Sequence, residues 1–243
     1  MKTFLAHARY LAGMFAWWMM VFVFFRLIFI ALNHSAFPDA ATTARGFIAA
    51  LPLDASMAGW FCVFTWLLLL LESLTGRRSR ILHRSMIAGL LIVYALIAVG
   101  EAAVYPEWKS KLNYKVMSVL AHPTEFLAIT TPGQLASMLA IWIVPSVALL
   151  LAWWRTGDRW LPDASRGRIP VRLRQAVLVF MLFVPLGILA RGGVQPIPVS
   201  MASVFYSNSQ ACNDLAVNPG WNMFFQIGNS WATFGKGNPF EFM

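Results

Sequence analysis

Residues 10–33 read YLAGMFAWWMMVFVFFRLIFIALN, an apolar run in which Arg26 is the single charge. A helix of about 20 residues spans the roughly 30 Å hydrocarbon core of a bilayer, so this run is long enough to cross a membrane. Lys2 and Arg9 precede it as in a cleavable signal peptide, but the run is too long for one and Arg26 interrupts it. We therefore predict a retained signal anchor that forms the first transmembrane helix.

Four further apolar runs follow, at residues 55–71, 85–105, 135–154 and 175–190. The last run is short and contains Pro185, which predicts a kink because proline removes a helix hydrogen bond and clashes with the preceding turn. The chain is 59% hydrophobic and only 12% charged, which excludes an ordinary soluble domain. The predicted fold is an all-α integral membrane domain of five transmembrane helices over residues 1–190, followed by a short outward-facing juxtamembrane tail at residues 191–243.

Lys and Arg divide unequally between the loops on the two sides of these spans. One side has twelve: Lys2, Arg9, Arg77, Arg78, Arg80, Arg84, Arg155, Arg159, Arg166, Arg168, Arg172 and Arg174. The other has six: Arg45, Lys109, Lys111, Lys115, Arg191 and Lys236. Because basic loops stay inside, we predict a cytoplasmic N-terminus, an outside C-terminus and a location in the cytoplasmic membrane. The net charge of +9 is then a topology signal, and no nucleic-acid partner is predicted.

An outer interfacial helix is predicted between the third and fourth spans. Its apolar face would consist of Leu112, Val116, Met117 and Leu120, and its candidate headgroup contacts are the flanking residues Lys109, Lys111 and Lys115. A helix packed on the ends of the spans fits the same pattern equally well. Thr131 and Gln134 then form a predicted capping box at the start of the fourth span.

Four charges are predicted to gather near the outer leaflet. Arg26 and Glu101 lie at the same depth in the first and third spans, Asp54 opens the second span, and Arg191 closes the fifth. They could form a lipid-headgroup site, with Arg26 or Arg191 on the phosphate and Asp54 or Glu101 on a hydroxyl or amine. They could also be structural, with an Arg26–Glu101 ion pair and Arg191 at the interface. The structural interpretation is favoured because two of the four lie at span ends.

Several short motifs resemble those of a known family. The outer loop carries Glu101, Tyr105-Pro106-Glu107-Trp108, Lys111-Leu112-Asn113-Tyr114 and His122-Pro123-Thr124-Glu125. The tail carries Arg191-Gly192-Gly193-Val194-Gln195-Pro196-Ile197, Tyr206-Ser207-Asn208 and Asn218-Pro219-Gly220-Trp221-Asn222. In this order, and with Asp54 in the stretch 51–56, the motifs resemble the membrane region of lipoteichoic-acid-synthase-like proteins of the sulfatase and alkaline phosphatase superfamily.

In that family a five-span anchor precedes a large outward catalytic domain that transfers phosphoglycerol or phosphoethanolamine from a phospholipid. The resemblance implies that this chain is the anchor and positions lipid, with membrane phospholipid and a catalytic domain, its own or separately encoded, as partners. A divalent metal is expected only in that domain, so no cofactor or metal site and no catalytic residue is predicted here. After Arg191 the chain offers only Asp214 and Glu241 as carboxylates and no histidine.

Two alternatives are kept open. The chain could be a free-standing membrane scaffold or lipid-binding protein that catalyses no reaction. It could also be a small transporter subunit, although five spans without repeated halves are not typical of secondary transporters.

Overall fold

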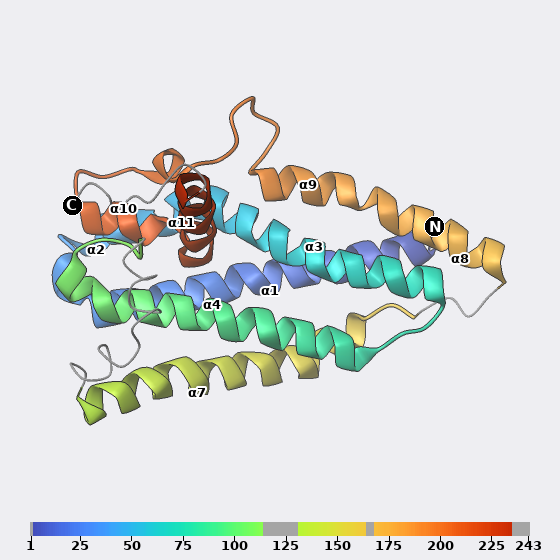
Figure 1. Ribbon diagram of the computed structural model, residues 1–243, viewed down its shortest axis with the longest axis horizontal. Helices are drawn as coiled ribbons and strands as arrows, with labels where there is room; N and C mark the ends of the chain where they lie inside the picture. The colour runs from blue at the N-terminus through green and yellow to red at the C-terminus, as the bar shows by residue number, and fades with distance from the viewer. Residues whose placement is uncertain (1, 114–130, 164–167, 235–243) are drawn as a thin grey trace.

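A computed structural model of the chain describes residues 2–113, 131–163 and 168–234, and its regular elements there are all helical (Figure 1). The predicted all-α fold is confirmed. Within the described residues, five helical segments are long and apolar enough to cross a membrane. They are α1 (Lys2–Leu32), α3 (Leu51–Thr75), α4 (Arg80–Trp108), α7 (Pro132–Thr156), and the pair α8 (Ile169–Met181) and α9 (Phe183–Arg191).

Each helix extends beyond the apolar run that predicted it, because helical hydrogen bonding continues into polar residues until a cap ends it. Ser79 caps the start of α4 by accepting a hydrogen bond from the Leu82 amide. Thr131 and Gln134 form the predicted capping box of α7. At the end of α3, Gly76 adopts a left-handed conformation with φ of 69°, which glycine tolerates without strain.

The fifth span is broken at Leu182, between α8 and α9. Pro185 explains the break, because its nitrogen cannot donate and its ring would clash with the carbonyl four residues earlier, that of Met181. The predicted kink is therefore confirmed. Next to the break, the Trp66 Nε1 of α3 donates a hydrogen bond of 2.7 Å to the Val179 carbonyl and ties the two spans together.

The core is built on an aromatic stripe of α1. Tyr10, Met14, Trp18 and Phe22 recur at every fourth residue and are at most 1% exposed, so they form one buried face of the helix. The Trp18 ring lies with its centroid 4.3 Å from that of Phe61 on α3, and the Phe22 centroid lies 4.8 Å from that of Tyr94 on α4. The stripe thus joins the first three spans.

Helices α3 and α9 approach each other closely at Gly59. A Cβ atom on Gly59 would lie only 2.7 Å from the backbone nitrogen of Ala190, so a larger residue would force the helices apart. Three residues earlier, the Ser56 hydroxyl donates a hydrogen bond of 2.6 Å to the Ala190 carbonyl. Small residues of this kind allow close helix packing in membranes, where water does not drive helices together.

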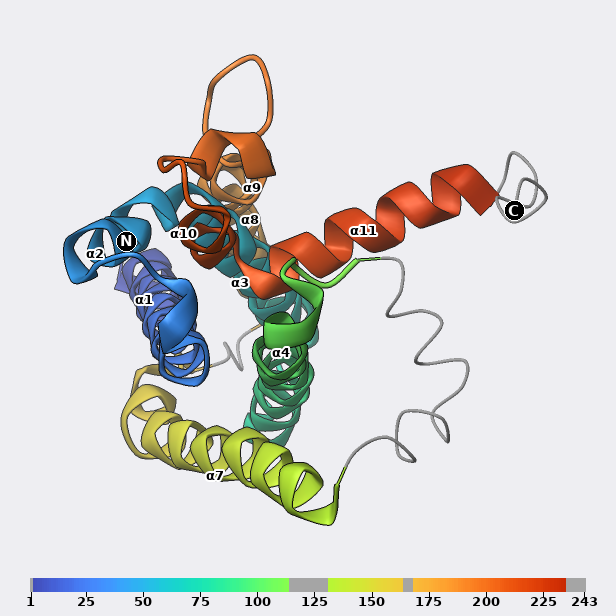
Figure 2. The same cartoon turned by 90° about the vertical axis from the view of Figure 1, so that its left-hand side faces the viewer.

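Helix α7 lies at one side of the bundle, next to α4 (Figure 2). Trp142 anchors it with a hydrogen bond of 3.0 Å to the Ile92 carbonyl. Its other face is apolar and exposed, as expected for a helix surface in contact with acyl chains: Leu139, Ile143, Val144, Val147 and Leu151.

The α3–α4 turn and the segment after α7 meet at one end of the bundle, which we call the basic end. Arg84 forms an ion pair of 2.6 Å with Asp158, which lies in η2 (Gly157–Trp160). The buried Glu72 accepts a hydrogen bond from the Ser79 amide and is also hydrogen-bonded to the His83 ring. Arg172 at the start of α8 donates to the Thr75 carbonyl over 3.0 Å. The loops predicted to be cytoplasmic are therefore neighbours in space.

The opposite end, which we call the tail end, holds shorter helices (Figure 1). They are η1 (His34–Ala36), α2 (Ala40–Ala49), η3 (Met201–Val204), α10 (Gln210–Ala216) and α11 (Pro219–Phe234). Helix α10 packs on α2 and α1, whereas α11 runs across the direction of the spans (Figure 2). The tail is thus largely helical within its described part and packs on the bundle, with Cys212, Leu215, Ala216 and Val217 buried.

Candidate functional site

A buried ion pair joins the first two spans at the tail end. Arg26 of α1 donates from both terminal nitrogens to Asp54 of α3, over 2.8 and 2.9 Å. The two residues are 5% and 1% exposed. Asp54 lies in the first turn of α3, where the helix dipole favours a carboxylate, and the two-pronged geometry is the strongest form of an arginine–carboxylate pair.

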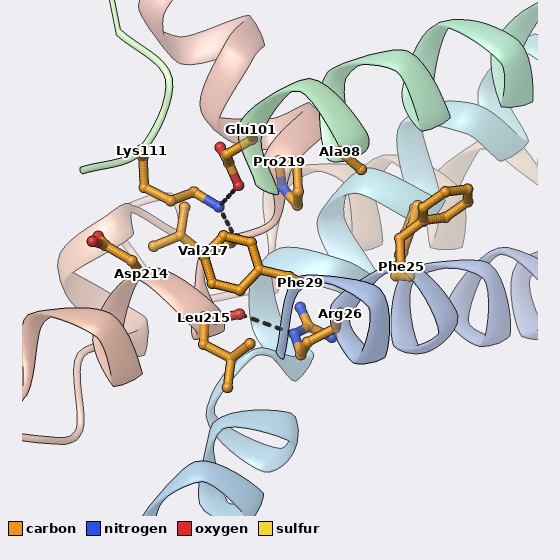
Figure 3. Close-up of a pocket in the computed structure, with 11 residues that line it drawn as sticks. Phe25, Arg26, Phe29, Ala98, Glu101, Lys111, Asp214, Leu215, Val217 and Pro219 are labelled. Atoms are coloured by element: carbon orange, nitrogen blue, oxygen red, sulfur yellow. Dashed lines mark hydrogen bonds and ion pairs between the residues drawn. The ribbon is translucent and has the colours of Figure 1, made fainter. Parts of the chain in front are cut away.

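The predicted Arg26–Glu101 pair is wrong. Glu101 pairs instead with Lys111, ten residues further along the chain, and Lys111 Nζ also donates to the Val217 carbonyl over 2.9 Å. Figure 3 shows the Phe29 ring between Arg26 and the Glu101–Lys111 pair. Arg26 and Glu101 line the same small cavity, but a neighbouring aromatic side chain and a nearer acid decide the pairing.

Lys111 is therefore not one of the headgroup contacts predicted for it, because its side chain is only 10% exposed and points into the tail end. Lys109 is exposed and ends α4 in a left-handed conformation with φ of 50°. Lys115 and most of the predicted interfacial helix, 112–120, lie outside the described residues. Leu112, at its start, is buried.

The tail supplies neutral groups to both ion pairs. The Arg26 Nε donates to the Leu215 carbonyl over 3.0 Å (Figure 3). The Asn218 side-chain amide donates to Asp54 over 2.8 Å. The Asn218 side-chain oxygen accepts from the Trp221 amide over 3.2 Å and so caps α11. Asn218 thus starts α11 and fixes it to the spans. We call Arg26, Asp54, Glu101, Lys111 and Asn218 the polar cluster.

Asn218 was not singled out by sequence reasoning as a site residue. The signal was present, since an asparagine before a proline is a typical N-cap followed by the favoured first helical residue. Its second role, toward Asp54, depends on a contact 164 residues away and could not be read from local sequence. Asn222, one turn further on, makes a similar long-range contact, donating to the Leu112 carbonyl over 2.7 Å.

A second acid of the tail lies beside the polar cluster. Asp214 on α10 accepts hydrogen bonds of 2.9 Å from the Tyr105 hydroxyl and from the Gln210 side chain. Burial raises the pKa of the Asp214 carboxyl, and the hydrogen bonds from Tyr105 and Gln210 and the charge of Lys111 oppose that rise only in part. Tyr105 thereby links the end of α4 to α10.

The space left between these side chains is small. A cavity of about 20 Å³ is lined by Arg26, Glu101, Lys111, Asp214 and the aromatic rings of α1. That volume suits one water molecule, whereas small-molecule sites usually enclose roughly 300–1,000 Å³. With Arg26 hydrogen-bonded through all three of its nitrogens, the cluster binds protein groups and leaves no room for a lipid headgroup.

Arg191 does not join the polar cluster. It is exposed at the end of α9, where its terminal nitrogens donate to the Gly193, Gln195 and Pro196 carbonyls and stabilise the following loop. It lies at the rim of a separate groove on the flank of α3 and α9. Of the four charges proposed from sequence, Arg26 and Asp54 bond the tail directly and Glu101 is linked to it through Lys111, whereas Arg191 is exposed and bonds its own loop.

No group of three His, Cys, Asp or Glu side chains in the described ranges is placed to hold a metal ion. Comparison of the chain with protein-family models, with curated proteins and with solved structures finds no match. The class of protein supported by the structure is a multi-pass helical membrane protein.

Proposed function

We propose that this chain is the membrane-anchoring and lipid-positioning domain of a sulfatase-family transferase that moves phosphoglycerol or phosphoethanolamine groups at the outer face of the cytoplasmic membrane. The resemblance to lipoteichoic-acid-synthase-like proteins supports the chemistry. The excess of Lys and Arg at the basic end supports a cytoplasmic position for that end. The catalytic domain, with its divalent metal, would be supplied by a further part of the protein or by a separate chain.

One observation carries the proposal. Residues quoted for the resemblance come from three distant stretches of sequence, and in the structure they form two pairs that both reach the tail: Asp54 accepts a hydrogen bond from Asn218, and Glu101 pairs with Lys111, which also donates to the Val217 carbonyl. Hydrogen bonds of Arg26, Asp54 and Tyr105 to tail residues fix the tail to three spans, α1, α3 and α4. A tail held in this way would keep an attached catalytic domain at a constant height above the membrane, where phospholipid headgroups are.

The direct test is headgroup transfer in membranes that contain the complete product of the gene and its neighbours. Radiolabelled phosphatidylglycerol or phosphatidylethanolamine should lose its headgroup to an acceptor, and a chelator should stop the transfer. Asn218→Ala should lower the rate at unchanged protein level, whereas Asn208→Ala, at an exposed position of the same tail, should not.

The DNA beyond codon 243 gives an independent check. It should encode, in frame or nearby, a domain with a metal-site threonine or serine and clustered Asp, Glu and His residues. A stop codon with no such reading frame nearby, together with absent transfer, would overturn the proposal in favour of a free-standing scaffold or lipid-binding protein.

A further inference from the structure

Two adjacent apolar grooves lie on the flank of the bundle, between α3, α9 and the crossing helix α11. The first, of about 490 Å³, is lined by residues that include Trp60, Phe183, Gly187, Arg191, Val199 and Trp221. The second, of about 420 Å³, is lined by Met57, Trp60, Phe64, Trp221, Phe224 and Phe225. Because they share Trp60 and Trp221, we treat them together as the flank groove. Each part has the size usual for a ligand site.

The walls of the flank groove are suited to an acyl chain. Trp60 and Phe64 on α3 are 50% and 42% exposed. Both belong to a membrane span, so their exposed rings would contact lipid. Helix α11 runs across the spans (Figure 2) and lines the same groove with Phe224, 60% exposed, and Phe225, whose ring stacks on Trp221 at 5.4 Å. A chain lying along α3 would therefore contact aromatic rings from two helices.

The rim of the groove carries a positive charge. Arg191 is exposed there, and its hydrogen bonds to the Gln195 and Pro196 carbonyls hold the guanidinium in place. An arginine at the end of a span is at the depth of lipid phosphates, which it binds by charge-assisted hydrogen bonds. The groove thus combines a long apolar slot with a fixed cation at one end, which is the pattern of charge and polarity in a glycerophospholipid.

A separate groove, outside the flank groove, provides a comparison. It lies between α1 and α7, encloses about 510 Å³, and is lined only by apolar residues, among them Phe24, Ile28, Leu32, Ala140 and Val144. Ordinary boundary lipid would fill either groove with acyl chains. Selection for a phosphate is expected in the flank groove alone, because Arg191 has no counterpart among the residues that line the α1–α7 groove.

We infer that the flank groove binds one glycerophospholipid, with an acyl chain beside Trp60 and Phe64 and the phosphodiester at Arg191. This inference rests on the proposed function for the outward position of the tail end. It adds the place where a donor lipid would be held, which is the flank groove and not the polar cluster.

The test uses the full chain in dodecyl maltoside, a detergent without phosphate. Two probes carry the same diazirine acyl chain, one a phosphatidylglycerol and the other a diacylglycerol, and cross-linked peptides are mapped by mass spectrometry. The phosphatidylglycerol should label peptides with Trp60, Phe64 or Phe224 about tenfold more than the diacylglycerol, the gain expected for one charge-assisted contact. Both probes should label the α1–α7 groove equally.

Variants separate the charge of Arg191 from its role in the loop. Arg191→Gln should reduce flank labelling by phosphatidylglycerol to the diacylglycerol level, and Arg191→Lys should retain most of it. Gln195→Ala removes a 2.7 Å hydrogen bond to the Gly192 carbonyl in the same loop and keeps the charge, so labelling should persist.

Equal labelling of both grooves by both probes would overturn the site, since it would mark boundary lipid only. An equal loss in Arg191→Gln and Gln195→Ala would overturn the assignment of the phosphate to Arg191. Binding is measured without catalysis, so phosphate-selective labelling with absent headgroup transfer would refute the proposed function and leave this inference standing. Headgroup transfer without phosphate-selective labelling would refute this inference and leave the proposed function standing.

Discussion

The side-chain amide of Asn218 donates a hydrogen bond of 2.8 Å to the Asp54 carboxylate, and neither residue is more than 1% exposed. Asp54 also holds both terminal nitrogens of Arg26, so one carboxylate joins the first span, the second span and the tail. The tail end of this membrane protein is therefore organised around a buried acid at the very start of a transmembrane helix.

The Arg26–Asp54 pair should be essential as a pair. Arg26→Leu or Asp54→Leu alone leaves an uncompensated buried charge and should cost about 3–5 kcal/mol of stability. The double variant should recover a large part of that loss, whereas Arg26→Leu with Glu101→Leu should not. Thermal unfolding of the four variants in detergent measures the coupling. Rescue by Glu101→Leu and none by Asp54→Leu would contradict the observed pairing.

Loss of the Asn218 amide should loosen the tail while the spans stay folded. Asn218→Ala removes a hydrogen bond to a charged group and the cap of α11, and should cost about 1.5–3 kcal/mol. Hydrogen exchange should rise in α10 and α11 and remain unchanged in α1 and α3. The matched control Asn208→Ala should stay within about 0.5 kcal/mol of the wild type, as exposed substitutions do. Equal effects of the two variants would argue against a specific role for Asn218.

The close approach of α3 to α9 should depend on Gly59. Gly59→Ala places a methyl group against the Ala190 backbone and should destabilise the protein by about 1–3 kcal/mol. Gly89→Ala on α4 is the control, because its methyl group would meet nothing within 4 Å, and alanine favours a helix. Thermal unfolding of both variants gives the comparison. A Gly59→Ala protein as stable as Gly89→Ala would show that the helices can separate at no cost.

The stability difference between wild type and Asp214→Asn should depend on pH. Burial raises the folded-state pKa of Asp214, so the folded protein binds this proton more tightly than the unfolded chain, whose value is about 3.9. The wild type should therefore lose stability relative to the variant as pH rises from about 4 through the folded-state value. Unfolding of both proteins measured across that pH range tests the sign of this stability difference. A gain in stability of the wild type relative to the variant with rising pH would contradict it.

The two ends of the bundle should be reached by reagents from opposite sides. In intact cells, a membrane-impermeant maleimide should label Asn208→Cys at the tail end, and should label Arg159→Cys at the basic end only after the membrane is permeabilised. The native Cys62 and Cys212 are buried and give a low background. Labelling of Arg159→Cys in intact cells would reverse the orientation derived from the distribution of Lys and Arg.

Features that depend on local sequence were predicted correctly. The five apolar runs, the break caused by Pro185 and the capping box of Thr131 and Gln134 all follow from neighbours within a few residues. Each is set by helix length, by the missing amide of proline or by a hydrogen bond across three residues.

Features that depend on the direction in which a side chain points were not predicted from the sequence. Counting residues along the spans predicted that Arg26 and Glu101 lie near each other, and both line one cavity, but such a count does not give the direction of a side chain around a helix axis. Phe29 fills the space between them, and Asp54 and Lys111 are the partners that the packing offers. Gly59 was also not singled out, because a glycine that permits close packing looks like any other until the neighbouring helix is known.

The two ion pairs also bear on how the protein is inserted during synthesis. Each buried charge finds its charged partner nearby in the chain, 28 residues away for Arg26 and Asp54 and 10 for Glu101 and Lys111. A lone arginine at the centre of a span costs about 2.5–3.5 kcal/mol to insert, so early arrival of Asp54 lets the first two spans enter the bilayer as a neutral hairpin. The tail is made after the spans and brings uncharged groups, the Leu215 carbonyl and the Asn218 amide, to charges that can already be paired. We therefore expect insertion of the spans and packing of the tail to be separate steps, because the charged partners lie within the spans and their loops and the tail adds only neutral groups.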